Sequence, residues 1–232
     1  MTDFKMPQHV IDRVMEKRGR LNVFDSFDTN KTAFLVIDMQ NFFVSGVQSC
    51  IDVVPNINRL AATVRNEGGM VVWVLLTVAE TVNGPSLWPI YHENFFTEEK
   101  GAAHKNGLTR GSKGHALYED LLTDPDDLIS EKTRFSALVQ GASDLHEKLQ
   151  SRGIENVLIG GTLTNMCCES TARDAMMIGY RTIMVEDCNA SRNAEDHIVG
   201  LTSVYQSFGD VRSTDDVIHN VLGQKQAGIA AK

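Results

Sequence analysis

Short apolar segments rich in β-branched residues alternate along the chain with segments of helical periodicity. The predicted strands cover residues 33–38, 70–76, 127–131, 156–161, 181–186 and 208–213. Helices are expected near 7–18, 52–67, 141–152, 166–178, 193–206 and 214–222. Strands that alternate with helices in this way are typical of a parallel sheet built from right-handed crossover connections. The pattern therefore predicts an α/β fold with six parallel strands.

The segment 77–126 departs from this alternation. It contains Gly84-Pro85 and Trp88-Pro89, shows little periodicity, and carries three of the seven histidines. Long segments without clear elements are often functional excursions over an active site. We therefore interpret residues 1–232 as one domain, with a helical extension over 1–25 and an elaborated active-site loop region over 77–126. A separate small domain is the less favoured alternative.

Composition and charge exclude several classes of partner. The chain is 42% hydrophobic and 22% charged, with a net charge of −8, which argues against nucleic acid and anionic membranes as partners. The N-terminus has no signal-peptide core, and the longest apolar run, 70–79, is half of the about 20 residues that a membrane span needs. We expect a cytoplasmic protein that acts on a small molecule.

The four cysteines are Cys50, Cys167, Cys168 and Cys188, and none has C-x-x-C spacing. The adjacent pair could be a metal clip, a redox pair, core filler, or a nucleophile beside a bystander. Vicinal cysteines make a strained disulfide, and the histidines are scattered singly, so that a zinc site lacks further ligands. We expect reduced thiols and no metal or cofactor.

Three complementary groups follow predicted strands. Asp38 ends the first strand, Lys132 follows the third, and Cys167 follows the fourth. Because the carboxyl ends of parallel strands share one edge of a sheet, these side chains should meet at a ligand site. Each alone has an ordinary interpretation, as a turn residue, a solvated lysine or a buried thiol. Together they predict a nucleophile, a proton shuttle and an activating cation.

The position of Cys167 suggests how it is activated. It falls in the first turn of the predicted helix, where the helix dipole and a nearby ammonium favour the thiolate. Attack on a carbonyl carbon would release ammonia or an amine, and water would then hydrolyse the thioester. Cys168 aligns with Ala172 and Ala175 and should pack in the core. Cys188 is placed beyond the fifth strand and Cys50 in a loop.

Three segments resemble the isochorismatase-like cysteine hydrolases over roughly residues 30–215: "VIDMQNFF", "EKTRFSA" and "GTLTNMCCESTARDAMMIGYRTIMVEDCNAS". The resemblance implies a doubly wound six-stranded sheet of Rossmann-type order, with helices on both faces. It also implies a triad of Asp38, Lys132 and Cys167, a cis peptide between Thr162 and Leu163, and an oxyanion hole formed by the backbone N–H groups of Leu163 and Cys167. A homo-oligomer, tetramer or dimer, is expected.

Departures from the family pattern narrow the activity. Phe42 replaces an acidic residue, and Cys168 replaces a valine. The D-x-H…H metal pattern of nicotinamidases is missing from 77–100, which disfavours nicotinamide and a metal. True isochorismatases lack the cysteine nucleophile. The resemblance therefore implies hydrolysis of a small linear ureide or carbamoyl amide, such as biuret, triuret, ureidoacrylate or an N-carbamoyl amino acid. Alternatives are a maleamate-type amide or a non-catalytic binding role.

Several residues are candidates for substrate contacts. Gln206 is similar in placement to a glutamine that contacts substrate in biuret-type enzymes. The other candidates are Arg134, Phe43, Asn165, Trp88 and Tyr91, with Asn83, His92 and Arg110 as further loop residues.

Overall fold

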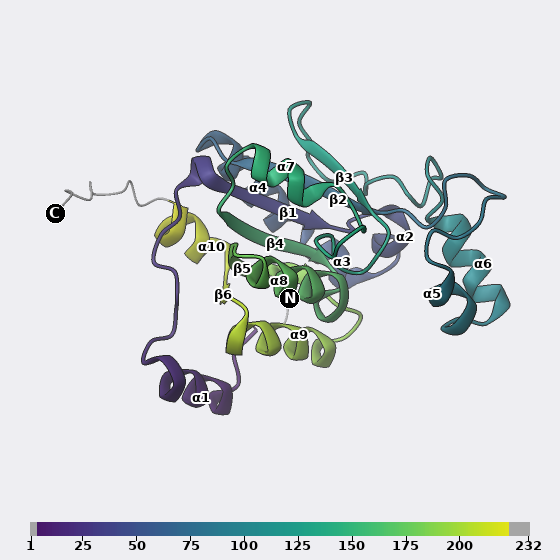
Figure 1. The fold of residues 1–232 in the computed structure, drawn as a ribbon. Helices are drawn as coiled ribbons and strands as arrows, with labels where there is room; N and C mark the ends of the chain where they lie inside the picture. Colours follow the sequence, from purple (N-terminus) through teal and green to yellow (C-terminus); the bar gives the residue numbers. More distant parts are fainter. Residues whose placement is uncertain (1–3, 223–232) are drawn as a thin grey trace.

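The computed structural model describes residues 4–222, and its centre is a six-stranded, all-parallel sheet (Figure 1). The strand order is β3-β2-β1-β4-β5-β6, which confirms the predicted doubly wound arrangement. The strands are β1 Thr32–Ile37, β2 Met70–Leu76, β3 Leu128–Lys132, β4 Asn156–Thr162, β5 Arg181–Ala190 and β6 Asp210–Arg212.

Helices cover both faces of the sheet. The α-helices are α1 Gln8–Arg18, α2 Asn41–Val44, α3 Gln48–Asp52, α4 Val54–Asn66, α5 Pro89–Asn94, α6 Glu98–Gly107, α7 Leu145–Ser151, α8 Glu169–Met177, α9 Ala194–Ser207 and α10 Thr214–Asp216. A short 3₁₀ turn, η1 Thr29–Lys31, precedes β1, and two π-helical turns are η2 Thr164–Cys168 and η3 Val217–Leu222. Within residues 4–222, no helix has the length and apolar character of a membrane span.

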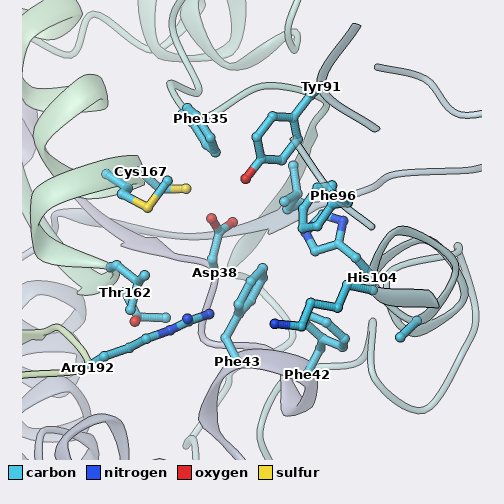
Figure 2. Close-up of a pocket in the computed structure, with 15 residues that line it drawn as sticks. Asp38, Phe42, Phe43, Tyr91, Phe96, His104, Phe135, Thr162, Cys167 and Arg192 are labelled. Carbon is cyan, nitrogen blue, oxygen red and sulfur yellow. The ribbon is translucent and has the colours of Figure 1, made fainter. Parts of the chain in front are cut away.

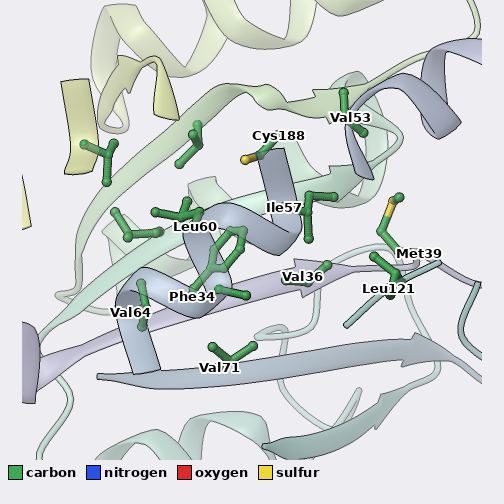
Figure 3. Close-up of a cluster of buried hydrophobic side chains, with 14 of the residues drawn as sticks. Phe34, Val36, Met39, Val53, Ile57, Leu60, Val64, Val71, Leu121 and Cys188 are labelled. Carbon is green, nitrogen blue, oxygen red and sulfur yellow. The ribbon is translucent and has the colours of Figure 1, made fainter. Parts of the chain in front are cut away.

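Successive residues of β1 pack on opposite faces, which produces two apolar layers. Phe34 and Val36 pack with α4, where Ile57 and Leu60 are fully buried (Figure 3). Leu35 and Ile37 belong to the second layer, with residues of α7, α8 and α9. All six residues of β1 are buried, as expected for a central strand covered on both sides. The ends of this rigid strand layer therefore provide firm positions for a site.

The structure corrects several details of the sequence interpretation. β5 continues to Ala190, so Cys188 lies inside the strand, with its thiol in the core 3.2 Å from the Thr214 hydroxyl. Cys50 is a buried residue of α3 rather than a loop residue. The periodicity missed α5 and α6 within 77–126, and α7 begins later than predicted. None of these differences moves the strand ends that carry the candidate triad.

Gly161 marks a close approach between β4 and β1. Its φ is +121°, and an added Cβ would meet the Ile37 carbonyl oxygen. Gly161→Ala should therefore lower the free energy of unfolding by about 3 kcal/mol or more, measured by urea denaturation. Gly153→Ala is the matched control, because Gly153 has a φ of +67° but open space around it, and should cost about 1 kcal/mol. Equal losses would show that the close approach does not matter.

Candidate active site

Asp38 lies directly after β1, with its carboxylate at the centre of the site. Its φ is +53°, a left-handed conformation that aspartate tolerates better than most residues. The backbone N–H of Asp38 donates to the Val74 carbonyl at 2.8 Å, which holds this turn against the neighbouring strand. The side chain is only 1% exposed. The sheet edge therefore holds this carboxylate in a defined place.

Lys132 is the last residue of β3, and its side chain is fully buried. Its Nζ donates to Asp38 Oδ2 at 2.8 Å and to the Arg134 carbonyl at 2.9 Å. Lysine is rarely buried without a partner, because an ammonium loses its hydration there. The ion pair with Asp38 provides that compensation. The interpretation of Lys132 as an ordinary solvated lysine is therefore wrong.

Cys167 lies in η2, between the end of β4 and the start of α8. Its thiol interacts with both the Asp38 carboxylate and the Lys132 ammonium, so the three predicted residues meet. The peptide bond between Thr162 and Leu163 is cis, as the sequence resemblance implies. Single π-helical turns are frequent at functional sites. Cys168 is fully buried among Ala172 and Ala175, which confirms its core position.

The charges of this cluster determine which proton moves. Burial raises the pKa of the Cys167 thiol, the charge of Asp38 raises it further, and Lys132 opposes the shift. Burial also raises the pKa of Asp38 against the influence of Lys132. Burial acts to lower the pKa of Lys132, but the charge of Asp38 outweighs it and the pKa is raised. Burial and the charge of Asp38 therefore act on the thiol against Lys132, and the sequence argument from the helix dipole left burial out.

Asp38 is the group that can accept the thiol proton. Its Oδ2 accepts from Lys132, and the Cys167 thiol and the Leu76 backbone also interact with this carboxylate, whose Oδ1 is buried. A carboxylate with a raised pKa is a better base than an ordinary one, which suits proton transfer from a thiol.

Asp38 and Cys167 open onto a cavity of about 350 Å³ at the carboxyl ends of the strands (Figure 2), with Lys132 buried behind Asp38. The cavity is bounded by strand ends on one side and by α5 and α6 on the other. Its lining residues are Asp38, Phe42, Phe43, Leu76, Tyr91, Phe96, Lys100, Ala103, His104, Phe135, Thr162, Leu163, Met166, Cys167 and Arg192. The volume suits a small molecule.

Two of the six predicted substrate-contact residues, Phe43 and Tyr91, line this cavity. Arg134 and Trp88 lie behind the wall: the guanidinium covers the Trp88 ring at 5.2 Å and donates to the Leu87 carbonyl. Asn165 is also set back, where its Oδ1 accepts from the Ser191 hydroxyl. These three residues therefore support the wall.

Gln206 is placed wrongly by the sequence interpretation. Helix α9 runs from the cavity edge of the sheet to the opposite edge, so its last turn is remote from the triad. There the Gln206 Oε1 accepts from Arg13 of α1 at 2.8 Å. Of the further loop residues, Arg110 is tied to Glu131 and Glu80 in ion pairs, Asn83 is exposed, and His92 lies behind His104.

Sequence reasoning missed most of the outer wall. Arg192 follows β5, and Lys100 and His104 come from α6. Arg192 could have been found by the same strand-end argument that found Asp38, had the end of β5 been predicted correctly. The residues of α6 carried no such signal, because that helix has no buried residue to produce an apolar stripe.

Comparison with known proteins agrees with this geometry. The isochorismatase domain family matches residues 32–216. This chain belongs to the isochorismatase-like cysteine hydrolase family. A relative from Arabidopsis thaliana, named a probable inactive nicotinamidase, is 31% identical over 177 residues, which are 73% of this chain and 86% of the relative.

Solved structures of the isochorismatase-like fold resemble this chain. A cysteine hydrolase from Pseudomonas syringae pv. phaseolicola 1448A superposes with a TM-score of 0.71 at 26% identity, covering 86% of this chain and 96% of that one. N-carbamoylsarcosine amidase from Thermoplasma acidophilum shares the fold, with a TM-score of 0.63 at 24% identity over 80% and 97% of the two chains. The family assignment made from the sequence is thereby confirmed.

Proposed function

We propose that this isochorismatase-like protein is a cysteine amidohydrolase that cleaves the terminal C–N bond of a small ureido or carbamoyl acid and releases ammonia. The observation that carries the proposal is the meeting of Cys167, Asp38 and Lys132 at the floor of one cavity that Cys167 and Asp38 line, with the thiol in contact with both charged groups. A thiol beside a base and a cation is the arrangement required for nucleophilic attack on a carbonyl.

The first half-reaction forms a thioester. As Sγ of Cys167 attacks the carbonyl carbon, the thiol proton passes to Oδ1 of Asp38. The oxygen of the tetrahedral intermediate would be held by the backbone N–H groups of Leu163 and Cys167. Asp38 then returns the proton to the leaving nitrogen, and the C–N bond breaks to release ammonia.

The second half-reaction restores the enzyme. Water attacks the thioester carbonyl and gives its proton to Asp38, the C–S bond breaks, and the sulfur regains a proton from Asp38. With a ureide as substrate, the product is a carbamic acid. Throughout the cycle Lys132 stays a cation that keeps the pKa of Asp38 from rising further and stabilises negative charge on sulfur.

The charges of the cavity wall favour an acidic substrate. Arg192 and Lys100 line the cavity, whereas Asp38 is the one acidic residue among the described lining residues. A carboxylate on the substrate would complement these cations, preferably through a bidentate pair with Arg192. This favours ureidoacrylate, maleamate and N-carbamoyl amino acids over the uncharged ureides biuret and triuret.

A non-catalytic binding role is the alternative, since one relative is named a probable inactive nicotinamidase. A substrate panel distinguishes the two possibilities. Ammonia release should be measured with N-carbamoylglycine, N-carbamoylsarcosine, ureidoacrylate, maleamate, biuret and triuret. We expect turnover of at least one acidic member; no ammonia from any of the six would contradict the proposal.

Arg192 provides a narrower prediction. Arg192→Gln should raise KM by about 10- to 100-fold for the acidic substrate that the wild type uses best, with a smaller effect on kcat. The reason is that the substrate carboxylate loses its cationic partner already in the bound ground state. The matched control is Arg181→Gln, since Arg181 is an exposed arginine at the opposite end of β5. Steady-state kinetics test this. An unchanged KM in Arg192→Gln would remove Arg192 from the binding site.

A further inference from the structure

The imidazole of His104 forms part of the cavity wall and ends a chain of hydrogen bonds. Its Nδ1 lies 2.9 Å from Nε2 of His92, and Nδ1 of His92 lies 2.7 Å from the Ser86 hydroxyl and 3.1 Å from the Trp88 carbonyl oxygen. This series of hydrogen bonds therefore links the Trp88 carbonyl, through the rings of His92 and His104, to the cavity.

One arrangement of the ring protons satisfies the backbone contact. The Trp88 carbonyl can only accept, so a hydrogen bond to it places the proton of His92 on Nδ1, whereas donation by the Ser86 hydroxyl would reverse both rings; the spectra described below decide between the two. In a neutral ring this leaves Nε2 of His92 as an acceptor, which requires the proton of His104 to be on Nδ1. Nε2 of His104 is consequently a bare acceptor, and no residue within 4–222 donates to it.

The rings are held in place and stay neutral. Phe96 stacks on His104 with ring centres 4.9 Å apart, and Phe42 meets the same ring edge to face at 5.5 Å. Burial, with a contribution from His92, lowers the pKa of His104 to about 4. Burial also lowers the pKa of His92. Near pH 7 both rings therefore stay neutral, and the donor and acceptor roles along this series of hydrogen bonds do not change.

We infer that His104 is a specificity-determining residue whose Nε2 accepts a hydrogen bond from the secondary ureido N–H of the bound acid. The inference rests on the proposed function and deepens it. It assigns the substrate class as acids whose scissile carbamoyl group is attached through an N–H rather than through an N-alkyl nitrogen.

His104 offers the acceptor nearest the far wall of the cavity. Arg192 and Lys100 can only donate, Asp38 is required for the thiol proton, and the Thr162 hydroxyl is bonded to the Ala190 carbonyl. The Tyr91 hydroxyl also enters the cavity, beside Phe135 and on the other side of Asp38 from Arg192 (Figure 2). Figure 2 shows His104 across the Asp38 carboxylate from Cys167, with Arg192 on a third side. A ureido acid with its carbonyl at Cys167, its leaving NH₂ beside Asp38 and its carboxylate at Arg192 has one polar group left, the secondary N–H. Replacing this N–H by N–CH₃ would leave Nε2 unpaired and shielded from water, which is unfavourable.

Two substrates that differ only at this nitrogen test the inference. N-carbamoylglycine carries the N–H, and N-carbamoylsarcosine carries a methyl group instead. We expect wild type to prefer N-carbamoylglycine in kcat/KM by about tenfold, the scale of one well-placed hydrogen bond. His104→Phe should reduce this preference to within about twofold of unity, whereas the control His146→Phe, at a histidine that bonds Tyr180 outside the cavity, should retain it.

The ratio of two substrates is insensitive to a merely structural defect, which would lower both rates together. A preference that persists in His104→Phe would show that the wall discriminates by shape, and it would overturn the inference. Equal use of both substrates by wild type would overturn it as well.

The tautomer can be measured without turnover. Two-bond ¹H–¹⁵N correlation spectra of the full-length protein should show His104 as the neutral Nδ1–H form, and His92→Phe should abolish this single-tautomer signature. A proton on Nε2 of wild-type His104 would make it a donor and overturn the inference. If the spectrum agrees but wild type hydrolyses neither ureido acid while it hydrolyses maleamate, the assignment of substrate class is wrong. If it hydrolyses no member of the panel, the proposed function itself fails.

Discussion

Cys167→Ser should abolish ammonia release, whereas Cys168→Val should retain most of it. The two sulfurs are adjacent in sequence, but Cys167 lines the cavity beside Asp38 and Cys168 is fully buried in the second apolar layer. A serine hydroxyl is far harder to deprotonate than a thiol, so Asp38 is too weak a base for it. We expect a loss of at least about 10³-fold in kcat for Cys167→Ser, measured with the best substrate of the panel.

Stability measurements separate this effect from misfolding. Cys168→Val changes the shape of a buried side chain only slightly, and should cost less than about 1.5 kcal/mol in the free energy of unfolding. Cys167→Ser should unfold in urea at nearly the wild-type midpoint. If Cys168→Val were inactive and Cys167→Ser active, with both folded, the nucleophile would be Cys168.

The parts of the site that follow strand ends could be predicted from the sequence. Alternating strand and helix patterns located Asp38, Lys132 and Cys167, because parallel strands bring their carboxyl ends to one edge. The cis peptide and the strand order came from the resemblance of the motifs, and not from the physics of any local segment.

The outer wall could not be predicted, because it depends on tertiary contacts. Helix α6 supplies Lys100 and His104, but its sequence lacks the apolar stripe that would indicate a helix. The length of β5 was underestimated because polar residues follow Val185, although Cys188 and Ala190 return to the core. Gln206 was assigned by similarity alone, and the course of α9 carries it to the wrong edge of the sheet.

Asp38→Asn and Lys132→Met should change the reactivity of Cys167 in opposite directions. The charge of Asp38 raises the pKa of Cys167 and that of Lys132 lowers it. Asp38→Asn should therefore speed alkylation of Cys167 by iodoacetamide at pH 7, and Lys132→Met should slow it, by about tenfold for each unit of pKa change. Intact-protein and peptide mass spectrometry measure the rate at this cysteine.

In Asp38→Asn the rate of hydrolysis should not rise with the rate of alkylation. Without a carboxylate to carry the proton from sulfur to the leaving nitrogen, turnover should fall by about 10²- to 10⁴-fold while the thiol becomes more reactive. This opposition distinguishes a proton shuttle from a residue that only orients Cys167, for which both rates would fall together. Slower alkylation in Asp38→Asn would contradict the assigned electrostatics.

Stability provides the matching test for the buried ion pair. Lys132→Met leaves the Asp38 carboxylate buried without its cation, and should cost about 3–5 kcal/mol in the free energy of unfolding near neutral pH.

The cost should depend on pH. Burial raises the folded-state pKa of Asp38 above its unfolded value, so this carboxyl group favours the folded state below the unfolded pKa. That contribution is lost as pH rises through the folded pKa. Losing Lys132 raises the folded pKa further, so the deficit of Lys132→Met should shrink on acidification. The double variant Asp38→Asn/Lys132→Met, with no buried charge, should recover most of the stability but none of the turnover. Recovery of stability without turnover in the double variant would show that this buried pair serves catalysis rather than folding.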